Sequence, residues 1–126
     1  MITLDITSSG VRLATDAGAA NARLMLPVAL PGNDYIWNQY TLRAPGAGRR
    51  DALRSAFDAR KIGTEIYYPV PMHVQECFQY CGYQPGDLPM ALKLAGEALS
   101  IPIYPELTRA QQDEIIDVLR EFAIQA

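Results

Sequence analysis

Two phenols and an imidazole gather in one short stretch, residues 64–73, whose sequence is Thr-Glu-Ile-Tyr-Tyr-Pro-Val-Pro-Met-His. Its two prolines fix their own φ angles and hold the residues before them in extended geometry, so the stretch has few conformations to choose from. Tyr67, Tyr68 and His73, the only histidine of the chain, are therefore presented on a stiff loop, which suits recognition of a polar ligand. Half-buried strand tyrosines and a hydrogen-bonded packing histidine are the structural alternative.

If the loop lines a binding cleft, we expect His73 and at least one of the two tyrosines to be partly exposed in the isolated domain, without strong partners inside it. A purely structural loop would bury these groups and hydrogen-bond them, because buried polar groups left unpaired are costly.

A metal site is the first rival interpretation. His73, Cys77 and Cys81 are spaced four residues apart and would share one face of a continuous helix, with Glu76 nearby as a fourth donor. The spacing is not that of the usual zinc-binding pairs, and Gly82 disfavours a helix that reaches Cys81. A cysteine nucleophile is a further alternative, but it needs a basic neighbour that lowers the pKa of the thiol, and only His73 could play that part. We interpret the cysteines as reduced thiols and predict no metal site.

The composition indicates one globular domain. Its 126 residues carry 11 basic and 14 acidic side chains, a net charge of -3, without a long run of either sign, so we expect no nucleic-acid and no membrane partner. No apolar run approaches the roughly 20 residues of a membrane-spanning helix, and the first residues lack the pattern of a signal peptide. We expect a soluble cytoplasmic protein.

The elements that position the loop follow from apolar periodicity and capping residues. We expect a hairpin over residues 2–13 that turns at Ser8, Ser9 and Gly10, followed by a loop over 15–30 and a central strand over 34–43. A helix from about 50 to 63, a strand that begins at Thr64 and a short helix over 73–80 come next. The last expected elements are a helix N-capped by Asp87, a strand over 100–104 and a helix N-capped by Thr108. This mixture predicts a small sheet with helices packed on one face.

The same periodicities select the expected core. Its helical members are Leu53, Phe57, Leu94, Ile115, Leu119 and Phe122, and its strand members are Tyr40, Leu42, Ile66 and Ile103.

The segment from Gly63 to Phe78 resembles the signature of the C-terminal small domain of DegT/DnrJ/StrS-type sugar aminotransferases. Other segments are similar to that domain in the right order: Trp37 to Arg43, Asp51 to Leu53, Gly86 to Pro89, Ser100 to Thr108, and Gln111 with Gln112. The resemblance runs from about Leu26 to Phe122, and we find none before it. We therefore divide the chain into an N-terminal extension, residues 1–25, and a small domain, residues 26–126.

The resemblance implies an α/β fold, the α+β-like small domain of a fold-type I aminotransferase, with a largely antiparallel sheet. Such enzymes use pyridoxal phosphate to aminate keto-sugar nucleotides, and their small domain closes one wall of the cleft at the domain and dimer interface. On this resemblance Tyr67, Tyr68 and His73 match the cleft loop, and Asn38 and Gln39 match the first strand. Many members carry His-Tyr where this chain has Tyr67-Tyr68, and a phenol can replace the imidazole as a donor.

The resemblance also assigns the Schiff-base lysine, the pyridinium partner and most phosphate contacts to a large N-terminal domain. The two lysines of this chain, Lys61 and Lys93, sit in no cofactor-like motif, and the turn from Pro45 to Gly48 lacks a phosphate-loop pattern. We therefore expect no catalytic and no cofactor-binding residue here, pyridoxal phosphate only in the complete enzyme, and no activity of the chain alone.

The expected partners are the large domain that binds pyridoxal phosphate, a sugar-nucleotide substrate and a second copy in a homodimer. The main alternative is a non-enzymatic dimerisation or docking module with the same fold, and a ligand-binding regulatory domain ranks third.

Overall fold

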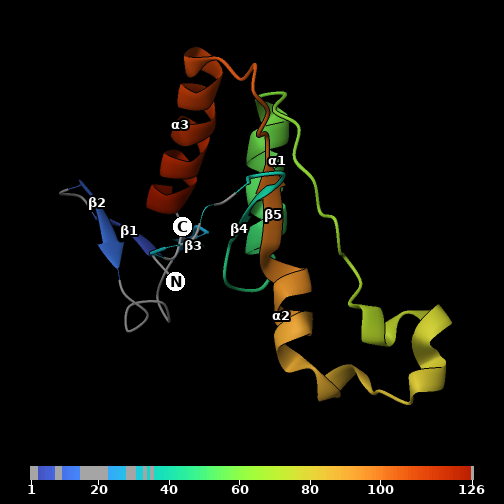
Figure 1. The fold of residues 1–126 in the computed structure, drawn as a ribbon. Coiled ribbons are helices and arrows are strands. Elements are labelled where there is room, and N and C mark those ends of the chain that lie inside the picture. Colours follow the sequence, from blue (N-terminus) through green and yellow to red (C-terminus); the bar gives the residue numbers. More distant parts are fainter. Residues whose placement is uncertain are drawn as a thin grey trace.

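The computed structural model describes residues 3–7, 10–14, 23–27, 31–32, 34 and 36–125, and its strands form one antiparallel sheet (Figure 1). The strands are β1 (Thr3–Thr7), β2 (Gly10–Ala14), β3 (Leu24–Met25), β4 (Tyr40–Arg43) and β5 (Ala98–Ile101), in the order β2-β1-β3-β4-β5. The expected fold class, a small α/β domain with a largely antiparallel sheet, is confirmed.

The N-terminal hairpin is present: β1 pairs with β2, with Thr3 opposite Ala14, whereas the expected turn residues Ser8 and Ser9 lie outside the described residues. The expectation of a loop over 15–30 is wrong at β3, which pairs with β1 on one side and β4 on the other. A strand of two residues is too short to show a period in the sequence, and only its neighbours in the sheet define it.

The helices are α1 (Arg49–Ala59), α2 (Pro89–Glu97) and α3 (Arg109–Gln125), with short 3₁₀ turns η2 (Met72–Val74), η3 (Glu76–Cys81) and η4 (Pro85–Asp87). The cap of α3 is confirmed, because Gln111 Oε1 accepts from Thr108 N at 2.9 Å and Thr108 Oγ1 accepts from Gln111 N at 3.3 Å. The cap assigned to Asp87 is wrong. Its carboxylate accepts from Gln84 N at 2.8 Å and closes η4, while α2 starts at Pro89.

Helices α1 and α3 pack on one face of the sheet and enclose the core. The buried cluster comprises Leu24, Leu42, Ala44, Leu53, Phe57, Leu99, Ile115, Val118 and Ala123. Of the other expected core residues, Ile66, Leu119 and Phe122 pack partly buried against this cluster, and Tyr40 and Ile103 are half-buried beside α3. Leu94 is the exception. It is 37% exposed, because the apolar stripe of α2 faces a pocket instead of the core.

The strand expected from Thr64 is reduced to a single bridge. Glu65 N donates to Ser100 O at 3.0 Å, and Ser100 N donates to Glu65 O at 2.8 Å. Pro69 and Pro71, which lack an N–H, prevent the ladder from continuing. The other expected strands are shorter than predicted. β4 lies inside the sheet, as expected, but begins only at Tyr40. β5 ends at Ile101, before Pro102.

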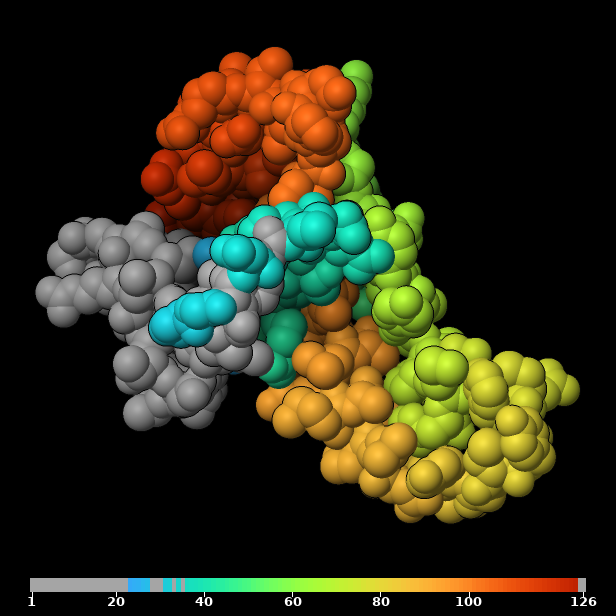
Figure 2. All heavy atoms as spheres, in the orientation of Figure 1, coloured from blue at the N-terminus to red at the C-terminus, as the bar shows by residue number. Residues whose placement is uncertain are grey.

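Residues 67–88, here called the arm, leave the sheet beside β5 and return to α2 (Figure 1). In the space-filling view the arm and the start of α2 form a lobe joined to the rest of the molecule by a narrower waist (Figure 2). The helices in the described part of the chain are all too short or too polar to cross a membrane.

Candidate functional site

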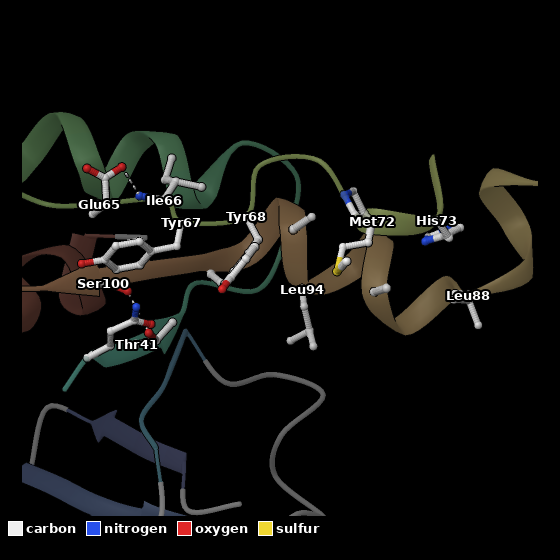
Figure 3. Close-up of a pocket in the computed structure, with 15 residues that line it drawn as sticks. Thr41, Glu65, Ile66, Tyr67, Tyr68, Met72, His73, Leu88, Leu94 and Ser100 are labelled. Atoms are coloured by element: carbon white, nitrogen blue, oxygen red, sulfur yellow. Dashed lines mark hydrogen bonds between the residues drawn. The ribbon is translucent and has the colours of Figure 1, made fainter. Parts of the chain in front are cut away.

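A pocket of about 470 Å³ lies between the start of the arm, helix α2 and the sheet (Figure 3). We call it the loop pocket. The arm contributes Tyr67, Tyr68 and His73 to the lining of the pocket. The sheet contributes Thr41, Ala98 and Ser100, with Gln39 just before β4, and α2 contributes Leu94 with Ala91 and Ala95. Most of the lining is apolar and a few polar groups converge on it, which is the usual composition of a small-molecule site.

The floor of the loop pocket follows from strand register. Thr41 of β4 is the partner of Ser100 of β5, so both side chains point to the same face, and their hydroxyl oxygens are 2.7 Å apart. The next pair, Leu42 and Leu99, points to the opposite face and is fully buried in the core. The sheet therefore has an apolar face covered by α1 and α3 and a polar face that opens into the pocket.

Tyr67 and Tyr68 project from the start of the arm over this polar face. They are 51% and 70% exposed. In Figure 3 both rings lie on the side of the chain toward Ser100 and Thr41, while Ile66 lies on the other side, where it packs against the core. The expectation that at least one of the two tyrosines is exposed is confirmed.

His73 does not meet that expectation. Only 8% of it is exposed, its Nε2 is 3.2 Å from the carbonyl oxygen of Pro85, and the edge of its ring meets Tyr83 with 6.4 Å between centroids. The expected exposure is wrong because the arm folds back on itself, so that η4 covers the imidazole. The ring still lines the loop pocket on one side and a smaller pocket within the arm on the other.

Asn38 and Gln39 are exposed just before β4. Gln39 lines the loop pocket, whereas Asn38 lines a neighbouring pocket of about 390 Å³, to which Gln39 and Tyr67 also belong. The structure thus brings Gln39, Tyr67, Tyr68 and His73 together and leaves Asn38 next to them.

Sequence reasoning missed Thr41 and Ser100 as pocket residues. Their signal is the alternation of polar and apolar residues along β4 and β5, but it becomes readable only once the two strands are paired.

The two cysteines are exposed in η3, and Cys77 Sγ lies 3.9 Å from Gln75 Oε1. Within the described ranges, no three side chains of His, Cys, Asp or Glu are placed to hold a metal ion. The absence of a metal site remains a prediction.

Residues 15–120 match the model of the DegT/DnrJ/EryC1/StrS aminotransferase family. The chain belongs to this family. The match begins at residue 15. The resemblance in individual motifs starts later, at about Leu26. Members of the family are sugar aminotransferases that depend on pyridoxal phosphate.

The chain is similar to the dTDP-3-amino-3,4,6-trideoxy-alpha-D-glucose transaminase of Streptomyces venezuelae, with 45% identity over 100 residues that cover 78% of this chain and 25% of that protein. It is also similar to the pleiotropic regulatory protein of Geobacillus stearothermophilus, with 40% identity over 99 residues, 79% of this chain and 26% of the relative. The chain therefore spans about a quarter of the length of the curated relatives it matches.

Solved structures agree with these matches. The crystal structure of S. venezuelae DesV in complex with a ketimine intermediate superposes with a TM-score of 0.74 at 40% identity, covering 84% of this chain and 28% of that one. A family aminotransferase from Brucella abortus gives a TM-score of 0.70 at 35% identity, covering 80% of this chain and 26% of that one.

The lysines of this chain do not fit the cofactor of the family. A Schiff-base lysine needs a desolvated setting near a phosphate cradle. Lys61 is exposed just after α1 with a φ of 57°, and Lys93 is exposed on α2. Neither lines any of the pockets described around the sheet, the arm and α3. No step through pyridoxal phosphate can be assigned to the residues described.

Proposed function

We propose that this chain is the C-terminal small domain of a sugar-nucleotide aminotransferase that depends on pyridoxal phosphate, and that it forms one wall of the substrate cleft. A large domain outside these 126 residues supplies the lysine, and the chain alone is inactive. The loop pocket is the observation that supports this proposal, since it gathers four of the five residues expected at the site on one concave surface.

Each of these residues has a separate role in the proposed wall. Tyr67 and Tyr68 are exposed and contact the substrate with ring faces and hydroxyls. Gln39, with Asn38 beside it, offers amide groups that both donate and accept hydrogen bonds. His73 is a positioning residue, because its bond to Pro85 O closes the arm that carries the tyrosines.

The second candidate function, a dimerisation or docking module, has its own support. Helix α2 and the residue before it leave large apolar side chains exposed: Leu88, Met90, Leu92 and Leu94 are 44%, 60%, 37% and 37% exposed. These side chains lie on more than one side of the helix, since residues two apart do not share a face, and exposed apolar groups of this size are typical of an interaction surface. In the favoured proposal Met90 and Leu92, which do not line the loop pocket, pack against the large domain or a second copy in a dimer.

A chimera distinguishes the substrate wall from the dimerisation or docking module. Residues 26–125 would replace the matching segment of the Streptomyces venezuelae transaminase, to which this chain is 45% identical over 100 residues. We expect the chimera to turn over that enzyme's dTDP-sugar. Tyr68→Ala in the chimera should lower kcat/KM by about tenfold or more, the equivalent of about 1.4 kcal/mol of transition-state stabilisation.

Tyr80→Ala is the matched control, because Tyr80 is 82% exposed on the far part of the arm and lines none of the described pockets. It should leave turnover nearly unchanged. Equal turnover of the Tyr68 and Tyr80 variants in a folded, assembled chimera would reject the substrate wall and favour the docking module.

A further inference from the structure

We infer that the loop pocket takes the uncharged hexose ring of the substrate, not its diphosphate, and that the hydroxyl pair of Thr41 and Ser100 donates a hydrogen bond to an oxygen of that ring. The inference rests on the proposed function and specifies which part of a sugar nucleotide this wall recognises. It also adds two binding residues, Thr41 and Ser100, to the site.

Charge argues against a diphosphate in the loop pocket. Phosphate groups are held in proteins mainly by arginine, lysine and backbone N–H groups. The described residues that line the pocket include no arginine and no lysine. Arg43, two residues beyond Thr41 on β4, pairs with Glu97, with Nη2 and Oε2 2.6 Å apart. At the start of α2, the N–H groups of Ala91 and Leu92 already donate to Leu88 O.

The ionisable side chains of the lining do not supply a cation in their place. Glu65 is anionic. Its Oε1 accepts from Ile66 N at 2.9 Å, and in Figure 3 it lies on the opposite side of the chain from Tyr67 and Tyr68. His73 Nε2 is directed at the carbonyl oxygen of Pro85. The pocket is thus suited to a neutral ligand.

The floor of the pocket has one hydrogen-bond donor to offer. Thr41 Oγ1 and Ser100 Oγ are 2.7 Å apart, so one of their two O–H hydrogens lies between the two oxygens. The other O–H is left for a ligand, since each hydroxyl carries one hydrogen and either one can be the donor within the pair. Ser100 is only 5% exposed and Thr41 is half-buried, so the pair lies at the bottom of the pocket and not in open solvent.

The remaining lining fits the rest of a hexose ring. Ala91, Leu94, Ala95 and Ala98 form an apolar side that can contact the C–H groups of the ring. The tyrosine rings are apolar bodies with polar tips and can cover a second side of it. A mostly apolar pocket with a few convergent polar groups orients a neutral polyol through those groups.

Two probes separate the hexose ring from the diphosphate: methyl β-D-glucopyranoside and inorganic pyrophosphate. Each is titrated into the purified chain, and amide shifts are followed by ¹H–¹⁵N NMR. We expect the glucoside to shift the amides of Thr41, Tyr68 and Ser100 in a saturable way and pyrophosphate to leave them in place.

Two double variants test the hydroxyl pair. Thr41→Val with Ser100→Ala removes both hydroxyls and should weaken glucoside binding about fivefold, the effect of one net hydrogen bond. The conservative variant, Thr41→Ser with Ser100→Thr, exchanges the two residues, keeps both hydroxyls and should restore most of the binding that the first variant loses. Equal affinities of the two variants would overturn the role of the pair. If the first variant does not fold, the shifts in the unaltered chain still decide where the probe binds.

The outcomes also separate this inference from the proposed function. Shifts at Thr41 and Ser100 with pyrophosphate but not with the glucoside overturn the inference and leave the proposed substrate wall standing. Absence of shifts with both probes also overturns the inference, and the activity of the chimera then decides on the proposed function independently.

Discussion

His73 shows how a single side chain connects the site to the stability of the domain. Its imidazole joins η2 to η4 through the contact with Pro85 O, 12 residues further along the chain, and is 8% exposed. A buried ring that bridges two short turns holds both in place, because 3₁₀ turns of this length have little stability of their own. The histidine therefore holds together the folded-back part of the arm.

His73→Ala should lower the free energy of unfolding by about 1 to 3 kcal/mol, because it removes a buried ring together with its contact to Pro85 O. Chemical denaturation followed by circular dichroism measures the change. Tyr80→Ala, at a position 82% exposed, is the control and should stay within about 0.5 kcal/mol of the unaltered chain. Equal stability of the two variants would show that the arm does not depend on the imidazole.

Tyr40 gives a prediction about pH. Burial raises the pKa of its phenol above the ordinary value of 10.0. Because the pKa is higher in the folded state, the unfolded state loses the proton first, and the stabilisation present below pH 10 is lost as the pH rises through the folded pKa. Urea denaturation between about pH 8 and pH 11 should show that Tyr40→Phe reduces the loss of stability at high pH. The same slope in both proteins would contradict this assignment.

At the scale of elements, the two faces of the sheet explain why α1 and α2 differ. Helix α1 packs Leu53 and Phe57 against the apolar face, where both are fully buried. Helix α2 continues directly into β5, and its side chain Leu94 faces the loop pocket. One apolar stripe therefore stabilises the core, and the other lines the loop pocket.

Phe57→Ala should cost about 3 to 5 kcal/mol of unfolding free energy, as expected for truncation of a fully buried aromatic ring. Leu94→Ala, at a position 37% exposed, should cost less than about 1 kcal/mol. Thermal and urea denaturation of the two variants gives the comparison. Similar losses would mean that α2 contributes to the core as α1 does.

At the scale of the whole molecule, the chain spans about a quarter of the length of its curated relatives and carries exposed apolar side chains on α2. Both features fit a domain that works within a larger assembly. In the function proposed above, such a domain forms one wall of the substrate cleft, and the large domain holds the cofactor.

Borohydride reduction in the presence of pyridoxal phosphate tests whether this chain itself holds the cofactor. We expect no saturable adduct at Lys61 or Lys93 in the purified chain, because both lysines are exposed and away from the described pockets. Mass spectrometry of the digested protein locates any adduct. The chimera, which contains a large domain, is the positive control. A stoichiometric adduct at either lysine of this chain would contradict the proposal that the large domain supplies the Schiff-base lysine.

Short-range sequence patterns were enough to predict several elements, because the interactions that form these elements join residues a few positions apart. The capping pair Thr108 and Gln111, the helix around Phe57 and the stiff loop with its exposed tyrosines are of this kind. The family resemblance placed the candidate site on the same loop.

Only the tertiary structure decided the features that depend on contacts between distant residues. The pairing of Thr41 with Ser100, 59 residues apart, requires the register of β4 against β5. The burial of His73 requires the arm to fold back, and the exposure of Leu94 depends on which side of the sheet α2 meets. Side-chain alternation marks two faces along each strand, but the packing of α1 and α3 selects the one that becomes the core.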